Sequence, residues 1–288
     1  MSHRRLSLPT AVAGIALTAL ALAGCASGST SSGGATPGSS TDALEGLITP
    51  GKLTIATGET AYYPYVIDDD PASGEGFEAA VAYAVAEKLG FDDEDVVWVR
   101  TSFESAIAPG PKSFDFNIQQ YTITDERKQA VDFSSPYYEA SQSVVALEGG
   151  AAEGVTDIAG LKDLVLGAMT GSTSATTIEQ AIDPNVEPQL YSSNEDAVAA
   201  LSAGQIDAIV LDTPTAYVAA NFYIDDSFIV GELPAAGVPD QWGLLLAKDS
   251  ALTSAVSAAV ETLREDGTLE ALEDEWLGVF TEGITQLK

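Results

Sequence analysis

The chain has 288 residues, 45% of them apolar, which is enough for one large or two medium-sized domains with a sizeable core. Its formal net charge of −31 argues against nucleic acid and against a bare anionic membrane surface as partners. The single Cys excludes an intramolecular disulfide, and the single His, His3, lies at the start of the chain. We therefore expect no Ser–His–Asp or Cys–His catalysis, no metal site and no cofactor.

Residues 1–24 have the features of a secretory signal peptide. Arg4 and Arg5 precede an uncharged apolar run at residues 11–22, which is too short to span a bilayer comfortably. The segment ends in LAGC, which resembles the lipobox of bacterial lipoproteins, where cleavage precedes the Cys and its thiol receives a lipid. We therefore expect Cys25 to carry a lipid that holds the protein at the extracytoplasmic face of the cell membrane. An ordinary signal peptide with an incidental Cys is the alternative.

The next segment, residues 25–43, is rich in Ser, Gly, Thr and Ala and is typical of a flexible tether. Folded structure should begin near Leu44. From there, strand and helix patterns alternate, which favours a mainly parallel sheet. In the first half we expect strands at 52–56, 96–99 and 114–118, and helices at 77–89 and 102–108.

A similar alternation follows in the second half. Strands are predicted at 164–168, 206–211 and 241–246, and helices at 174–182, 194–202, 251–266 and 269–277. The two halves also contain a weak internal echo, because residues 113–120 align with residues 205–212. Each segment follows a short helix and ends at a polar residue, Gln120 or Asp212, on the carboxyl edge of a strand. Ligands of open α/β sheets bind at such edges, so these two residues are candidates to face each other across a cleft.

Several short motifs occur in a fixed order along the chain. They are YYPY at 62–65, GFE at 76–78, TITDER at 122–127, VDFSSPYY at 131–138, GST at 171–173, DA at 207–208, DTP at 212–214, DGT at 266–268 and EWLG at 275–278. In this order and spacing they resemble the family 3 extracellular solute-binding proteins, the polar amino-acid receptors of ABC importers. The resemblance extends from about Lys52 to Gly278.

The resemblance implies an α/β, two-lobe, periplasmic-binding-protein-like fold of type II, with a hinge and a ligand cleft between the lobes. Residues 44–142 and 241–288 would form the first lobe, and residues 143–240 the second. Strands near 142–146 and 238–242 would cross between them and allow closure around a ligand. The protein, expected to be a monomer, would capture a polar amino acid or a related small zwitterion and deliver it to an ABC transporter permease.

Arg127 is the candidate for binding the ligand carboxylate. It lies in the first turn of a predicted helix capped by Thr124, and its planar guanidinium suits a carboxylate bidentately. A surface salt bridge with Asp125 or Glu126 is the alternative for an isolated Arg. The resemblance favours the ligand, because the matching Arg of the family holds the ligand carboxylate.

Two segments of the second half are candidates for the same ligand. Ser172 and Thr173 follow a strand and open a helix, where free backbone N–H groups suit an anion; helix capping is the alternative. Asp212 ends a strand before Thr213, so it could cap the next helix. By resemblance, the first segment would bind the carboxylate and Asp212 the α-ammonium group.

Aromatic and acidic residues complete the expected site. By resemblance, Tyr62 and Phe103 would sandwich the ligand, although core packing is a substantial alternative for Phe103. Glu59 would contact the ligand side chain or line a solvated rim.

The segment QQY at residues 119–121 departs from the family, whose members usually have small residues there. Gln120 and Thr122 would add polar contacts, and Tyr121 would reshape the side-chain pocket. The binding of the α-carboxylate and α-ammonium should persist, whereas the identity of the ligand stays open.

Two other functions are compatible with this pattern. A few relatives of this fold resemble cyclohexadienyl dehydratases, and Asp or Glu could act as an acid or a base, although no nucleophile motif supports catalysis. A sensory receptor that reports the solute to a membrane kinase would use the same pocket. We expect a binding protein rather than an enzyme.

Overall fold

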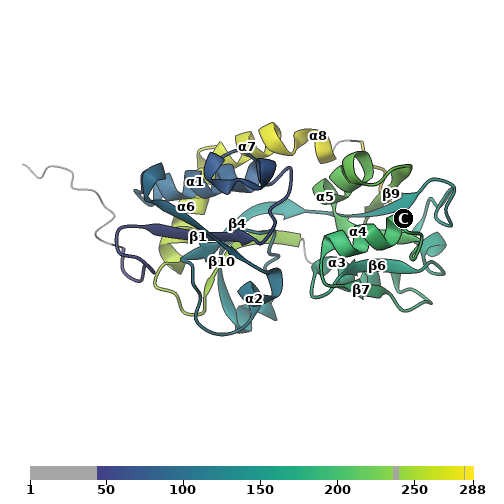
Figure 1. The fold of residues 1–288 in the computed structure, drawn as a ribbon, viewed down its shortest axis with the longest axis horizontal. Helices are drawn as coiled ribbons and strands as arrows, with labels where there is room; N and C mark the ends of the chain where they lie inside the picture. The colour runs from purple at the N-terminus through teal and green to yellow at the C-terminus, as the bar shows by residue number, and fades with distance from the viewer. Residues whose placement is uncertain (1–43, 236–239, 282) are drawn as a thin grey trace, which may run out of the picture. The chain divides into compact units, whose positions relative to one another are not determined.

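The computed structural model describes residues 44–235, 240–281 and 283–288 (Figure 1). The expected signal peptide, the lipidated Cys25 and the tether lie outside the described residues. The described part contains two five-stranded sheets. In that part, no helix is both long enough and apolar enough to cross a membrane.

The first sheet combines strands from both ends of the described chain. Its order is β2-β1-β3-β10-β4, in which β1 is parallel to β2 and β3 while β10 is antiparallel to β3 and β4. The strands are β1 (Leu53–Gly58), β2 (Val96–Thr101), β3 (Phe116–Asn117), β4 (Val131–Ala140) and β10 (Asp240–Ala247).

The second sheet is made from the middle of the chain. Its order is β7-β6-β8-β5-β9, with β6 parallel to β7 and β8, and β5 antiparallel to β8 and β9. The strands are β5 (Gln142–Leu147), β6 (Leu166–Met169), β7 (Gln189–Tyr191), β8 (Ala208–Asp212) and β9 (Ser227–Leu233). Both sheets therefore follow one plan, and both are mixed rather than mainly parallel as we expected.

The internal echo between the two halves corresponds to this shared plan. The aligned segments contain β3 and β8, and each of these strands takes the third position in its sheet. The predicted strand at 114–118 is reduced to Phe116–Asn117, whereas the predicted strand at 206–211 is nearly complete.

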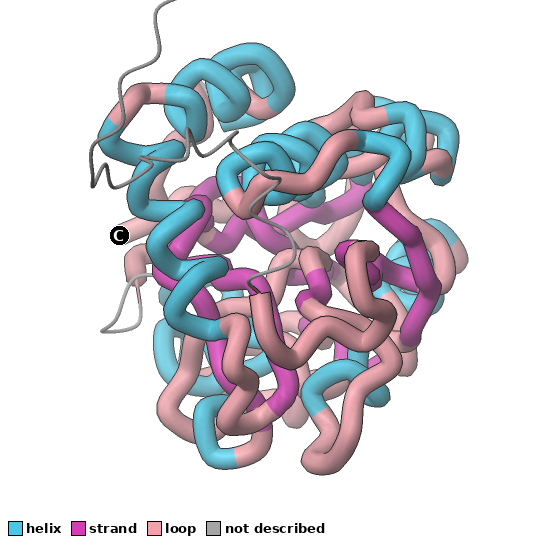
Figure 2. Tube along the Cα trace, turned by 90° about the vertical axis from the view of Figure 1, so that its left-hand side faces the viewer, coloured by secondary structure: helices cyan, strands magenta, loops and turns pink. Residues whose placement is uncertain are grey.

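Helices cover both faces of the first sheet because its strands alternate between two apolar cores. Leu53 and Ile55 of β1 belong to a large core with α1, α6 and α7, whereas Ala56 packs on the opposite side with α2. These helices are α1 (Phe77–Lys88), α2 (Phe103–Ile107), α6 (Thr253–Glu265) and α7 (Thr268–Trp276). Figure 2 shows helices on the outer side of the strands.

The second sheet has the same three-layer arrangement. Val210 of β8 packs in a core with Ile178, and its neighbours Ile209 and Leu211 pack in the core of α4 and α5. The helices are α3 (Thr173–Thr177), α4 (Asn194–Ser202) and α5 (Thr213–Val218), and π-helical turns at Ile178–Ile182 and Ala219–Tyr223 continue α3 and α5. The helix predicted at 174–182 is thus part α and part π. Single 3-10 turns occupy Ile67–Asp69, Pro71–Ser73, Asp93–Asp95, Arg127–Gln129 and Ile158–Leu161.

The end of the chain departs from the expected division. We expected residues 241–288 to belong wholly to the first lobe, but after α8 (Gly278–Thr281) the last residues pair with β9 of the second sheet. The N–H of Leu287 donates to the carbonyl of Glu232 at 2.8 Å, and the Leu287 side chain is buried in the second core. Gly231 makes this possible, because a Cβ there would lie only 2.7 Å from the Thr285 carbonyl oxygen.

Candidate ligand-binding site

A cavity of about 260 Å³ lies between residues of the two sheets. It collects the ends of β1, β3, β6 and β8 together with the starts of α2, α3 and α4. Eight of the ten predicted ligand-binding residues line it, namely Glu59, Tyr62, Phe103, Gln120, Arg127, Ser172, Thr173 and Asp212. Gln120 and Asp212, which the internal echo paired, therefore contribute to the same cavity.

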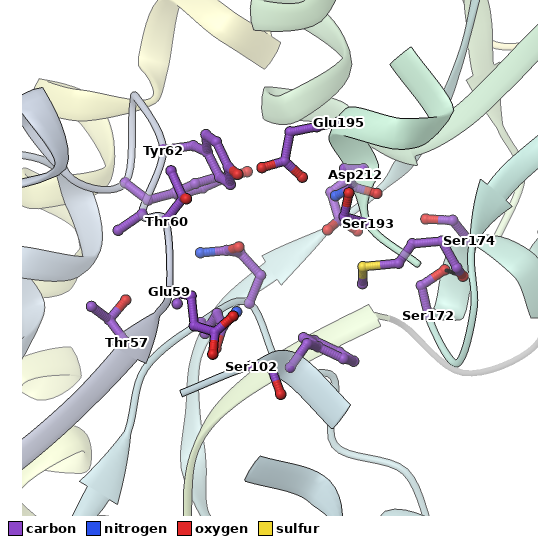
Figure 3. Close-up of a pocket in the computed structure, with 18 of the residues that line it drawn as sticks. Thr57, Glu59, Thr60, Tyr62, Ser102, Ser172, Ser174, Ser193, Glu195 and Asp212 are labelled. Atoms are coloured by element: carbon purple, nitrogen blue, oxygen red, sulfur yellow. Dashed lines mark hydrogen bonds between the residues drawn. The ribbon is translucent and has the colours of Figure 1, made fainter. Parts of the chain in front are cut away.

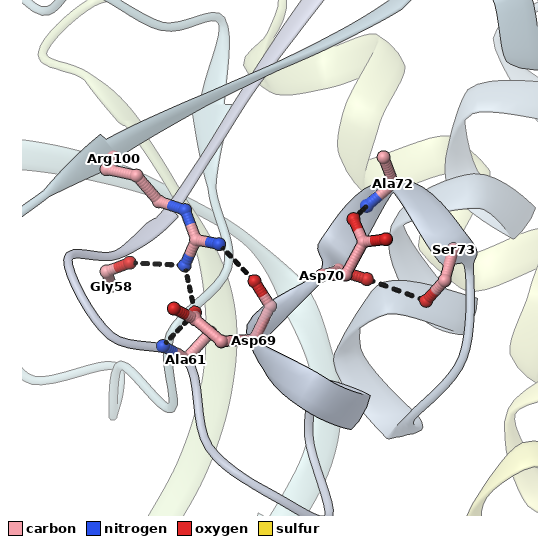
Figure 4. Close-up of polar contacts among 7 residues, drawn as sticks. All are labelled: Gly58, Ala61, Asp69, Asp70, Ala72, Ser73 and Arg100. Carbon is pink, nitrogen blue, oxygen red and sulfur yellow. Dashed lines mark hydrogen bonds and ion pairs between the residues drawn. The ribbon is translucent and has the colours of Figure 1, made fainter.

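The loop after β1 brings Glu59 and Tyr62 to the cavity (Figure 3). The loop is held from behind by Arg100 of β2, whose guanidinium donates to Asp69 at 2.6 Å and to the carbonyl of Gly58 at 2.9 Å (Figure 4). Asp69 also accepts the N–H of Ala61 at 2.8 Å. Burial alone would raise the pKa of Asp69, but the Ala61 bond and Arg100 bring it below its usual value. This pair fixes the loop that carries the lining residues.

Arg127 lies where the two sheets approach each other. Its backbone N–H donates to the Thr124 hydroxyl at 3.1 Å, but the predicted helix is only a single 3-10 turn, Arg127–Gln129, whose N-cap residue is Glu126. Its guanidinium donates to the carbonyl of Thr122 at 2.8 Å and to the carbonyl of Gly171, beyond β6, at 2.9 Å. The same group lies 5.4 Å from the ring centroid of Phe103. These bonds orient the guanidinium and occupy only part of its donor set.

Phe103 and Tyr121 are stacked, with ring centroids 4.5 Å apart and an angle of 24° between planes. Tyr121 is fully buried, and its hydroxyl donates to the carbonyl of Phe103 at 3.2 Å. It therefore supports the wall from behind instead of lining the cavity. The residue that we expected to reshape the pocket acts through the position of Phe103.

A buried carboxyl group supports Gln120. Glu78 in the first turn of α1 is 1% exposed and accepts the backbone N–H of Gln120 at 2.8 Å, the Gln120 side-chain amide and the hydroxyl of Tyr137. Burial raises the pKa of Glu78 to about 7, although these hydrogen bonds act in the opposite direction. Gln120 itself has a φ of 49°, a conformation unusual for a residue other than Gly. The contacts with Glu78 hold it there.

Asp212 belongs to a second buried acidic group. The side-chain amide of Gln142 donates to the Asp212 carboxylate. It also donates to the Asp240 carboxylate at 2.6 Å. Desolvation raises the pKa of Asp212 well above its usual value, and the neighbouring Asp240 adds to this shift. Two carboxylates so close together favour a cation beside them.

Thr122 is directed toward Asp240 and away from the cavity. Its hydroxyl donates to the Asp240 carboxylate. The Thr173 hydroxyl donates to the same carboxylate at 3.0 Å, and the two hydroxyl oxygens are 3.2 Å apart. Asp240 thus joins residues of both sheets.

Ser172 caps α3, because its hydroxyl accepts the N–H of Ala175 at 3.2 Å and donates to the carbonyl of Met169 at 2.7 Å. From the sequence we assigned no role in the site to four residues that the structure places there, Glu78, Gln142, Asp240 and Glu195. The only signal for any of them was the GFE motif, which contains Glu78.

The sequence of the chain matches the family model of the bacterial extracellular solute-binding proteins, family 3, over residues 53–279. The chain belongs to this family. The resemblance inferred from the motifs and the predicted type II fold are thereby confirmed, as is the substrate-binding function.

Individual relatives bind amino acids. The chain is 30% identical over 242 residues to the L-cystine-binding protein TcyJ of Escherichia coli (strain K12), covering 81% of this chain and 87% of the relative. It is 28% identical over 239 residues to the L-arginine-binding protein of Pseudomonas aeruginosa, and this match covers 78% of this chain and 88% of the relative. Among solved structures, an ancestral arginine-binding protein bound to arginine is 31% identical, with a TM-score of 0.65, and the match covers 79% of this chain and 99% of that one.

Proposed function

We propose that the cavity binds one amino acid as a zwitterion, with Arg127 holding the α-carboxylate and Asp212 the α-ammonium group. The observation that carries this proposal is that one cation and one desolvated carboxylate, from opposite sheets, line the same small cavity. Arg127 is oriented by two carbonyl oxygens, and its charge is suited to an anion. An ammonium group would relieve the repulsion between Asp212 and Asp240.

The remaining predicted residues fit subsidiary roles. Tyr62 and Phe103 would shield the ligand from water, and the backbone N–H of Thr173 would lie beside the carboxylate. The N–H of Ser172, which we also expected to be free, donates to the carbonyl of Met169 at 3.2 Å. Gln120 would contribute its amide. We further propose that the lobes, as predicted apart from the last residues, close around the ligand by movement at the connection from β4 to β5. The second predicted crossing, at residues 238–242, lies partly outside the described residues.

The proposed destination of the ligand is an ABC transporter permease, since the relatives named above are amino-acid-binding proteins and match this chain over most of its length. We propose that the chain acts as a monomeric binding protein and not as an enzyme. The check is an assay for lyase activity on prephenate-like substrates, in which we expect no turnover.

Attachment to the membrane would follow from lipidation of Cys25, as the LAGC ending indicates. The test compares the wild type with Cys25→Ser in the producing cell. The variant should be released or accumulate as uncleaved precursor, and unchanged membrane retention would contradict the tether.

The direct test of ligand binding is a thermal-shift screen of the full-length chain, purified in detergent and freed of bound solute by unfolding and refolding. At a concentration of about 100 times Kd, a ligand stabilises the folded state by about 2.7 kcal/mol. For a chain of this size we expect the melting temperature to rise by about 5–10 °C with at least one amino acid. If no amino acid shifts the melting temperature, the proposed ligand class is wrong.

A further inference from the structure

The charged residues that line the cavity are unevenly balanced. Four carboxyl groups, those of Glu59, Glu78, Glu195 and Asp212, line it, whereas Arg127 is the only Lys or Arg among the described lining residues. A zwitterion bound by Arg127 and Asp212 uses one charge of each sign. The protein surface around such a ligand is therefore still acidic.

Two of the four carboxyl groups have partners or a role already. Glu78 is buried and bonded to Gln120 and Tyr137, so it serves the fold of the wall. Asp212 is bonded to Gln142 and is assigned to the α-ammonium group. The acidic excess available to the ligand side chain thus comes from Glu59 and Glu195.

Glu59 and Glu195 stand on opposite walls of the cavity. Glu59 lies on the loop fixed by Arg100, which is itself paired with Asp69 and so does not neutralise Glu59. Glu195 lies in the first turn of α4, where Ser193 caps the helix by accepting the N–H of Asp196 at 3.2 Å. Figure 3 shows the Glu195 carboxylate directed across the cavity toward the side of Tyr62.

We infer that the site selects an amino acid with a basic side chain, whose guanidinium or ammonium group lies between Glu59 and Glu195. This inference rests on the proposed function and defines its substrate class. A cationic side chain is attracted by both carboxylates, and an acidic one is repelled by both without a second lining cation to offset the repulsion. Because both side chains are exposed, water and salt weaken the interaction. We expect a preference of at least about tenfold over a neutral ligand of the same shape.

The test uses two pairs of ligands that differ in side-chain charge at nearly constant shape, arginine with citrulline and lysine with norleucine, and adds glutamate. Calorimetric titration of the refolded full-length chain should give tighter binding of the cationic member of at least one pair. The preference should shrink as salt is raised from about 20 to about 500 mM, because the determinants are exposed charges.

Variants identify the residues responsible. The double variant Glu59→Gln, Glu195→Gln should lose the preference for the cation while still binding the neutral member. Glu153→Gln is the matched control, because Glu153 is an exposed acid in a turn outside the cavity. Melting curves without ligand verify that each variant is folded.

The outcomes separate this inference from the proposed function. If citrulline and norleucine bind as tightly as arginine and lysine, or glutamate binds more tightly, the inference is overturned while amino-acid binding stands. If the double variant keeps the full preference for the cation, Glu59 and Glu195 are not its source and the inference is also overturned. If none of these or any other amino acid binds, the proposed function itself fails.

Discussion

On the side of the first sheet, the residues that line the cavity depend on buried partners. Phe103 lies on fully buried Tyr121, and Gln120 is held by Glu78. On the side of the second sheet, small hydroxyl side chains next to helix starts line the cavity, and Ser172 is satisfied within its own turn. Both sheets have two parallel pairings followed by two antiparallel ones, so the walls differ in the segments that are attached to the strand ends. The first wall is fixed by its core, and the second combines local capping at Ser172 with the buried contact between Gln142 and Asp212.

The largest effect should come from Arg127, the cation of the core-supported wall. Removing one partner of a buried charge pair typically costs about 2–5 kcal/mol, so Arg127→Ala should weaken amino-acid binding by roughly 30-fold or more. Calorimetric titration measures the loss. Lys128→Ala is the control, because Lys128 is exposed and forms an ion pair with Asp125 at 3.4 Å. Equal losses of affinity in both variants would mean that the overall charge of the protein, and not the contact of Arg127 with the ligand, is responsible for the loss.

The next effect concerns the support of that wall by Glu78. The folded state binds the Glu78 proton more tightly than the unfolded chain, since burial raises its pKa from 4.5 to about 7. The stability linked to this proton is thus fully present when the pH is below the pKa of Glu78 in the unfolded chain, and it is lost as the pH rises through about 7. The full shift corresponds to about 3 kcal/mol at most.

Glu78→Gln removes the titration and tests this support. Relative to the wild type, the variant should gain stability between pH 5 and pH 8 in urea unfolding, by an amount approaching that limit. The exposed control Glu153→Gln should show the same pH dependence as the wild type. Parallel curves for Glu78→Gln and the wild type would contradict a titrating buried carboxyl group.

Asp212 on the second wall should make binding dependent on pH. Its pKa is raised by desolvation and by Asp240, and only the ionised form suits the α-ammonium group. Affinity should therefore fall as the pH is lowered through this pKa, by up to about tenfold for each pH unit below it. In that range binding should release a proton, which calorimetry in buffers of different ionisation enthalpy detects. Affinity that is constant from pH 4 to pH 8 would contradict the prediction.

The smallest effect belongs to the local capping of the second wall. Ser172→Ala removes the cap of α3 and should cost about 1 kcal/mol of stability, or about 2–4 °C in melting temperature. Ser254→Ala is the control, because Ser254 is exposed near the start of α6. A loss in the control as large as that in Ser172→Ala would remove the capping explanation.

The sequence predicted those features that depend on neighbouring residues. The cap of α3 at Ser172, the strand that ends at Asp212 and the start of α1 at Phe77 all follow from short-range patterns. The family motifs supplied the two-lobe fold, which no periodicity could have predicted. The shared pairing plan of the two sheets was visible only as the weak echo around Gln120 and Asp212.

The features that were missed depend on contacts between residues far apart in the chain. Thr122 turns from the cavity because Asp240 accepts its hydroxyl, and Glu78 looks like an ordinary acid at a helix start until its burial is known. The pairing of Leu287 with the second sheet depends on the space left at Gly231. Local propensity contains no information about such partners.

The most direct test of the zwitterion site is the titration of wild type and Asp212→Asn with the bound amino acid and with its analogue that has hydrogen in place of the α-ammonium group. We expect the wild type to bind the amino acid far more tightly than the analogue. Asp212→Asn should lose most of the affinity for the amino acid and retain that for the analogue. Equal losses for both ligands would mean that Asp212 serves the fold, and the account of the site would be contradicted.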